Sequence, residues 1–237
     1  MRPAATCFVV FLLAAIPAAT AFGQTSGIVS GKVTLTGTPP KAKVIDMSKE
    51  PECVKLNSKQ PMTEDTVIGP GNGLKNVVVF VSAGAPTTSS PRVTPVTLNQ
   101  QNCHYTTRVL AFQVEQEVRI TNSDPLTHNI HPMAVTNREW NKVQLKGSQP
   151  LSSSFDKAEF IPVKCNLHSW MRAYFAVMGT SYFAVTGEEG QFILPDLPPG
   201  KYTLTAWHEI YGTRNQEITV AAGQQVTVDV AYNAKAK

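Results

Sequence analysis

The sequence predicts an all-β protein with two successive β-sandwich units. Amphipathic helix patterns are almost absent, and short β-rich runs bounded by Gly, Pro, Asn and Ser dominate the chain. The 237 residues are 42% hydrophobic and 16% charged, which is the composition of an ordinary folded protein. This length allows one large or two modest domains with ample core.

The first 23 residues have the pattern of a secretory signal peptide. Arg2 gives a short basic start, residues 8–16 form an apolar core, and Ala19-Thr20-Ala21 supplies small residues for cleavage near Ala21–Gly23. The apolar stretch is too short for a stable membrane anchor, and no second run of spanning length follows. We therefore expect a mature protein without a transmembrane segment, located in the periplasm or secreted.

Residues 24–75 are expected to form N-terminal strands and loops. Residues 31–37 alternate apolar and polar side chains and stop at Pro39-Pro40, which is typical of an edge or first strand. Residues 46–73 are polar and rich in turns. In residues 76–81, Asn76 is followed by a continuous apolar run, which predicts a strand buried on both faces.

A first sandwich is predicted over residues 76–179 and a second over residues 180–237. In the first, strands are expected around 107–114 and 117–121, and strands on both sides of residues 165–171 make that segment a tight connection. In the second, residues 190–207 predict a strand, a Pro-Gly turn and a strand. Residues 235–237 are expected to be a frayed tail.

Cysteine usage points to one disulfide and one cysteine with another role. Removal of the leader removes Cys7 and leaves three cysteines, an odd number for an oxidising compartment. Cys165 has neighbours suited to metal binding, whereas Cys53 and Cys103 do not, so we pair Cys53 with Cys103. A disulfide made by Cys165, with a free third thiol, stays open as the alternative.

The segment 165–171 carries the clearest chemical motif. Cys165, His168 and Met171 are spaced C-x-x-H-x-x-M, which offers a thiolate, an imidazole and a thioether within one loop. With a second imidazole, this is the donor set of a mononuclear copper site that transfers electrons. His128, in N-S-D-P-L-T-H-N, is the expected second imidazole. His131 follows three residues later and would face the opposite side of an extended strand, so we expect it at the rim.

Other interpretations of these residues are weaker. A structural zinc site usually has more cysteines, and a catalytic Cys-His pair is usually distant in sequence. Met171 could be an ordinary core methionine, and Trp170 could be a cover over the site or a docking residue. His104 and His208 have no companions at ligand spacing.

These motifs resemble the cupredoxin family of blue copper proteins, in an amicyanin- or plastocyanin-like form. The resemblance covers residues 76–178 and implies a Greek-key sandwich that binds one type 1 copper through His128, Cys165, His168 and Met171. It also implies that Asn129 is a hydrogen-bonding link between the ligand loops. Finally, it implies that His168 reaches the surface within an apolar patch and serves as the electron port.

The C-terminal region resembles the carboxypeptidase regulatory-like domains, which are small transthyretin-like or Ig-like sandwiches. The resemblance rests on the stretch G-x-F-x-L-x-D-L-P-P-G-K-Y-T-L, which begins at Gly190. Residues 27–40 have a similar character. The first strand could therefore complete the C-terminal sandwich instead of the copper unit.

Together these features predict an exported type 1 copper protein that carries single electrons between redox partners. We expect no enzymatic activity, because the acidic residues form no paired catalytic constellation. The net charge of +4 comes without a Lys/Arg cluster, so nucleic-acid binding is not expected. The alternatives are a copper-binding or copper-delivery protein without electron transfer, and a structural β-sandwich protein of the cell envelope.

Overall fold

The computed structural model describes residues 25–86 and 92–234. The expected signal peptide, Cys7 and the tail at 235–237 lie outside these residues. Within them the protein is built from strands, and the two helical segments are the short helix α1 (Pro51–Leu56) and the 3-10 turn η1 (Pro70–Asn72). The predicted all-β class is confirmed. No helix in the described part of the chain has the length and apolarity that a membrane crossing requires.

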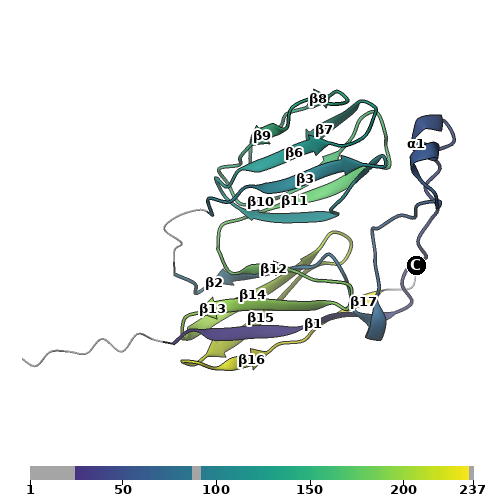
Figure 1. Ribbon diagram of the computed structural model, residues 1–237. Helices are drawn as coiled ribbons and strands as arrows, with labels where there is room; N and C mark the ends of the chain where they lie inside the picture. The colour runs from purple at the N-terminus through teal and green to yellow at the C-terminus, as the bar shows by residue number, and fades with distance from the viewer. Residues whose placement is uncertain (1–24, 87–91, 235–237) are drawn as a thin grey trace, which may run out of the picture.

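One unit is a sandwich of two sheets, and it lies in the lower half of Figure 1. In the first sheet, β1 (Gly27–Gly37) pairs with β13 (Gln191–Leu197), β16 (Gln225–Thr227) and β17 (Val230–Ala234). The second sheet has the order β12 (Phe183–Val185), β2 (Val78–Ala83), β14 (Gly200–His208), β15 (Gly212–Val220). The apolar side chains of both sheets form one continuous core. The first strand thus completes the C-terminal sandwich.

The predicted assignment of residues 76–81 to the copper unit is wrong. β2 pairs with β14, with Val79 opposite Ala206, and with β12, with Val79 opposite Ala184. Val78 and Val79 are both fully buried, which explains the continuous apolar run. Such a run shows burial on two faces but does not identify the neighbouring strands. The predicted copper unit is therefore inserted between β2 and β12 of the C-terminal sandwich, and does not simply precede that sandwich.

The inserted unit also contains two sheets (Figure 1). The five-stranded sheet has the order β5 (Val109–Gln113), β11 (Arg172–Met178), β10 (Glu159–Lys164), β7 (His128–Pro132), β8 (Lys142–Gln144). The other has the order β4 (His104–Tyr105), β3 (Val96–Gln101), β6 (Val118–Asn122), β9 (Leu151–Ser153). Phe112, Phe155 and Phe175 meet in the core between them, with ring centroids 5.5 to 6.1 Å apart.

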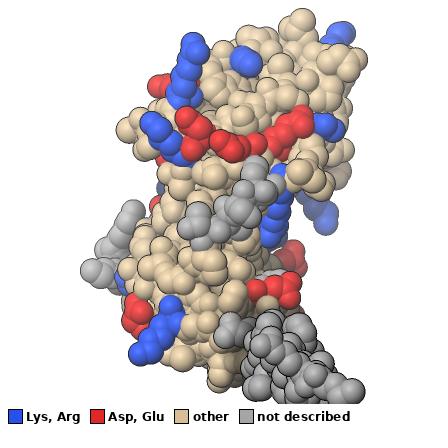
Figure 2. Space-filling model, turned by 90° about the vertical axis from the view of Figure 1, so that its left-hand side faces the viewer, with Lys and Arg blue, Asp and Glu red and all other residues tan. Residues whose placement is uncertain are grey.

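The two units are joined by packed side chains. Phe160 on β10 stacks on Trp207 of β14, with ring centroids 4.0 Å apart. Arg108, just before β5, pairs with Glu209 of the other unit at 2.6 Å and with Asp65 at 2.7 Å. On the face seen in Figure 2, acidic side chains form a band across the upper unit with basic side chains at both ends, and most of the remaining described surface is uncharged.

Candidate metal centre

Two neighbouring strands bring the predicted site residues together. His128 and Asn129 open β7, and Cys165 directly follows β10, which pairs with β7 at Val163↔Pro132 and Lys164↔His131. The loop 165–171 is closed by two backbone hydrogen bonds, from the amide of Cys165 to the carbonyl of Met171 (3.1 Å) and from the amide of Met171 to the carbonyl of His168 (2.9 Å). The strands fix both ends of the loop, so its side chains have defined positions.

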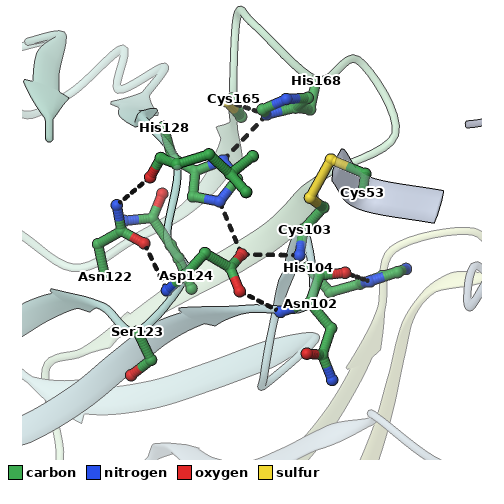
Figure 3. Close-up of polar contacts among 12 residues, drawn as sticks. Cys53, Asn102, Cys103, His104, Asn122, Ser123, Asp124, His128, Cys165 and His168 are labelled. Carbon is green, nitrogen blue, oxygen red and sulfur yellow. Dashed lines mark hydrogen bonds and ion pairs between the residues drawn. A yellow bond between two sulfur atoms is a disulfide. The ribbon is translucent and has the colours of Figure 1, made fainter. Parts of the chain in front are cut away.

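The side chains of His128, Cys165 and His168 converge in the interior (Figure 3). The two Nδ1 atoms lie 2.9 Å apart, and Cys165 Sγ lies 3.7 Å from His168 Nδ1. The three residues are between 0% and 4% exposed. One sulfur and two imidazole nitrogens, within 4.8 Å of one another, fit a soft ion such as copper.

Asn129 connects the two segments that carry these side chains. Its Oδ1 atom accepts hydrogen bonds from the amides of Asn166 (2.6 Å) and Leu167 (3.3 Å), and lies 3.2 Å from Cys165 Sγ. Its Nδ2 atom donates to Asn141 Oδ1 at 2.7 Å. This is the linking position that the family resemblance implied for Asn129.

Burial and hydrogen bonding act in opposite directions on Cys165. Burial raises the pKa of its thiol, but hydrogen bonds from His128 and His168 outweigh this effect and bring the pKa to about 5. Burial likewise lowers the pKa of His128, but its bonds to Asp124 and Cys165 raise the pKa above the ordinary value. The geometry thus favours a thiolate, the form in which cysteine binds a metal.

Asp124 is a site residue that the sequence interpretation did not single out. This carboxylate is 4% exposed, and its Oδ2 atom lies 2.8 Å from His128 Nε2. Its two oxygens also accept the backbone amides of Asn102 (2.6 Å) and Cys103 (2.8 Å). The only sequence signal was its position four residues before His128, within the motif already quoted.

Met171 and His131 differ in their suitability as a fourth ligand. Met171 is 1% exposed and belongs to the same hydrophobic core as Cys165, so it is buried close to the loop that it ends. His131 forms other contacts, with Asn166 Oδ1 at 3.2 Å and Glu139 Oε1 at 2.6 Å.

The expectation that His168 reaches the surface is wrong for this chain. His168 is only 4% exposed, and the ring of Trp170 packs against it with centroids 5.3 Å apart. Trp170 Nε1 in turn donates to the carbonyl of Cys103 at 3.0 Å, so this tryptophan is a cover over the site. The N-terminal segment adds a second cover over the site, which the motif at residues 165–171 did not predict.

That second cover is the helix α1, which is held by a disulfide. Cys53 on α1 is bonded to Cys103, with an S–S distance of 2.05 Å, as the cysteine count predicted. The sulfurs of this disulfide and a ring nitrogen of His168 lie within 4.8 Å of one another. Cys165 is the free cysteine among those that the structure describes. The disulfide therefore separates His168 from solvent on this side.

The two remaining histidines lie away from the convergent group. His104 bonds through Nδ1 to the carbonyl of Asn102 at 2.8 Å. His208 is 1% exposed and accepts the amide of Ile210 at 3.1 Å. Burial, assisted by the positive charge of Arg108, lowers the pKa of His208 to about 4, so it is a neutral core residue near neutral pH.

The fold and the site together define an all-β protein of two sandwiches with a buried Cys-His-His cluster. The model of the carboxypeptidase regulatory-like domain matches residues 174–233. The match includes most of β11 of the inserted unit and the strands of the C-terminal sandwich from β12 into β17. No curated protein sequence matches the chain significantly.

The similar solved structures include copper proteins. A copper-containing nitrite reductase from Thermus scotoductus is 18% identical with a TM-score of 0.34, over 40% of this chain and 27% of that one. The chain thus spans about a quarter of the reductase. Amicyanin from Paracoccus versutus is 17% identical with a TM-score of 0.33, over 42% of this chain and 97% of that one. A reduced amicyanin variant is 20% identical with the same TM-score.

Proposed function

We propose that the protein is a type 1 copper electron carrier that exchanges single electrons with other redox proteins. The observation that carries this proposal is the convergence of Cys165 Sγ with Nδ1 of His128 and of His168 in the buried interior. These three side chains would hold the ion, and Met171 is proposed as the weak fourth donor. Bound copper would supply a one-electron Cu(II)/Cu(I) couple.

The chain's own residues prepare this site for electron transfer. Asn129 ties the Cys165 loop to β7 through three contacts, so both segments keep their relative position. Hydrogen bonds from the two imidazoles favour the thiolate of Cys165. A site held rigidly by two strands changes little between oxidation states, and this lowers the cost of each electron transfer.

Burial of the donors favours an electron carrier over a copper-delivery protein. Delivery requires ligands that an acceptor can approach and replace, whereas the three donors here are at most 4% exposed. Electrons need no such access. Leu167, which is 54% exposed and adjacent to His168, marks a surface at which a redox partner could dock close to the site.

The visible spectrum of the copper-loaded protein tests the proposal. We expect an intense thiolate-to-copper band that disappears in Cys165→Ser and in His128→Ala. His131→Ala is the matched control, because His131 lies on the same strand but contacts Asn166 and Glu139 instead. An intense band that survives His128→Ala but not His131→Ala would overturn the ligand assignment. Copper binding without such a band would favour the delivery alternative.

A further inference from the structure

Asp124 makes a contact with the site that the proposed ligand set does not explain. Its carboxylate is almost fully buried, and it meets the side of His128 that faces away from the convergent cluster (Figure 3). Nε2 of His128 lies 2.8 Å from this carboxylate, while Nδ1 lies 2.9 Å from Nδ1 of His168. The two nitrogens of one ring thus have separate roles.

The carboxylate itself is held in a fixed position. It accepts the amides of Asn102 and Cys103, which form the turn between β3 and β4. Both residues have positive φ angles, 54° and 56°, which direct their two successive amides toward the carboxylate. Cys103 is also fixed by its disulfide to Cys53. Asp124 is therefore held by backbone that the disulfide constrains.

A fixed carboxylate determines which nitrogen of His128 carries a proton. An ionised carboxylate can only accept hydrogen bonds, so Nε2 must be the protonated nitrogen in this contact. In the metal-free site, Nδ1 carries the proton that it donates to the Cys165 thiolate. A bound ion would take the place of this proton, so that the lone pair of Nδ1 points to the ion while Nε2 keeps its own proton. A carboxylate bonded to the far nitrogen of a ligating imidazole also raises the donor strength of that imidazole.

From these contacts we propose that Asp124 is a positioning residue for the metal centre: it fixes the Nε2-protonated form of His128 and strengthens Nδ1 as a donor. This inference rests on the proposed function and deepens it. A nearby negative charge stabilises Cu(II) more than Cu(I), so Asp124 also holds the reduction potential down. The turn 102–103, fixed by the disulfide, keeps the carboxylate in place.

The variant Asp124→Asn tests the inference because it keeps the shape of the side chain and removes the charge. In the metal-free protein, ¹⁵N NMR should show a slowly exchanging proton on His128 Nε2, and this proton should exchange rapidly in the variant. Affinity for Cu(I), measured against a chromophoric chelator, should fall about 10- to 100-fold. Voltammetry of the copper-loaded protein should show a more positive potential.

Ser123→Ala is the matched control. Ser123 is adjacent, exposed, and contacts Asn99 but not His128, so the variant should leave the NMR signal, the affinity and the potential unchanged. A purely structural role for Asp124 would alter the unfolding temperature while the potential and the Nε2 proton stay the same, and this result would overturn the inference. An unprotonated Nε2 in the unmodified protein would also overturn it, even if Asp124→Asn fails to fold. The NMR measurement needs no copper, so it remains decisive if the copper proposal itself fails.

Discussion

The ionisation of Cys165 can be tested without any metal. With a pKa of about 5, against 9.0 for an ordinary thiol, about 99% of this side chain is thiolate at pH 7. A thiol that titrates near 9.0 would be about 1% thiolate at the same pH. This difference is large enough to measure from the absorbance of the thiolate near 240 nm.

Replacing His128 with Leu removes the larger of the two imidazole hydrogen bonds that lower this pKa. Burial of Cys165 persists, and burial disfavours the charged form, so the titration midpoint should move up toward 9.0. In the double variant that also carries His168→Leu, only the effect of burial and weaker backbone contacts remain. We expect its midpoint to be higher still, with little thiolate at pH 7.

The assay is a pH titration of absorbance in the copper-free protein, with Cys165→Ser subtracted as the blank. Circular dichroism at each pH shows whether the variants stay folded. A midpoint near 9.0 in the unmodified protein would refute the claim that the imidazoles prepare the thiolate. An unchanged midpoint in both His variants would assign the effect to the backbone contacts of Asn129 and of residue 168 instead.

Three further predictions concern the axial residue, the contact between the units and the disulfide. Met171→Gln should lower the reduction potential, because an oxygen donor stabilises Cu(II), and Met171→Leu should raise it; equal potentials by voltammetry would mean that Met171 does not bind the metal. Arg108→Met leaves Glu209, whose side chain is 6% exposed, without its partner, so urea unfolding should show a loss of about 3–5 kcal/mol. Burial already raises the pKa of Glu209, and without Arg108 the pKa rises further, so the loss should shrink as the pH falls and the carboxyl becomes neutral. Replacing both Cys53 and Cys103 with Ala opens a loop of sequence separation 50 and should lower the free energy of unfolding by about 4 kcal/mol in the same assay. No change in the urea midpoint would show that the disulfide does not constrain the unfolded chain.

Local patterns in the sequence were sufficient for the fold class and for naming the three side chains that converge in the candidate site. Apolar and polar side chains alternate with a period of two along a strand, and turn residues mark where it ends, so both indicate strands without knowledge of the partners. The spacing of Cys165, His168 and Met171 is likewise local, because one short loop carries all three. We paired Cys53 with Cys103 because only Cys165 has neighbours suited to metal binding, and the structure contains that disulfide.

Only the tertiary structure decided which strands share a sheet and what surrounds the candidate metal centre. The apolar run forms β2, and no local feature of its sequence indicates that its neighbours in the sheet are β12 and β14. Asp124 contacts Asn102 and Cys103, more than twenty positions earlier, and His168 is covered by a disulfide whose Cys53 lies far upstream. Sequence patterns report the burial and spacing of each segment, whereas strand pairing, the partners of a buried carboxylate and the exposure of an imidazole depend on long-range packing.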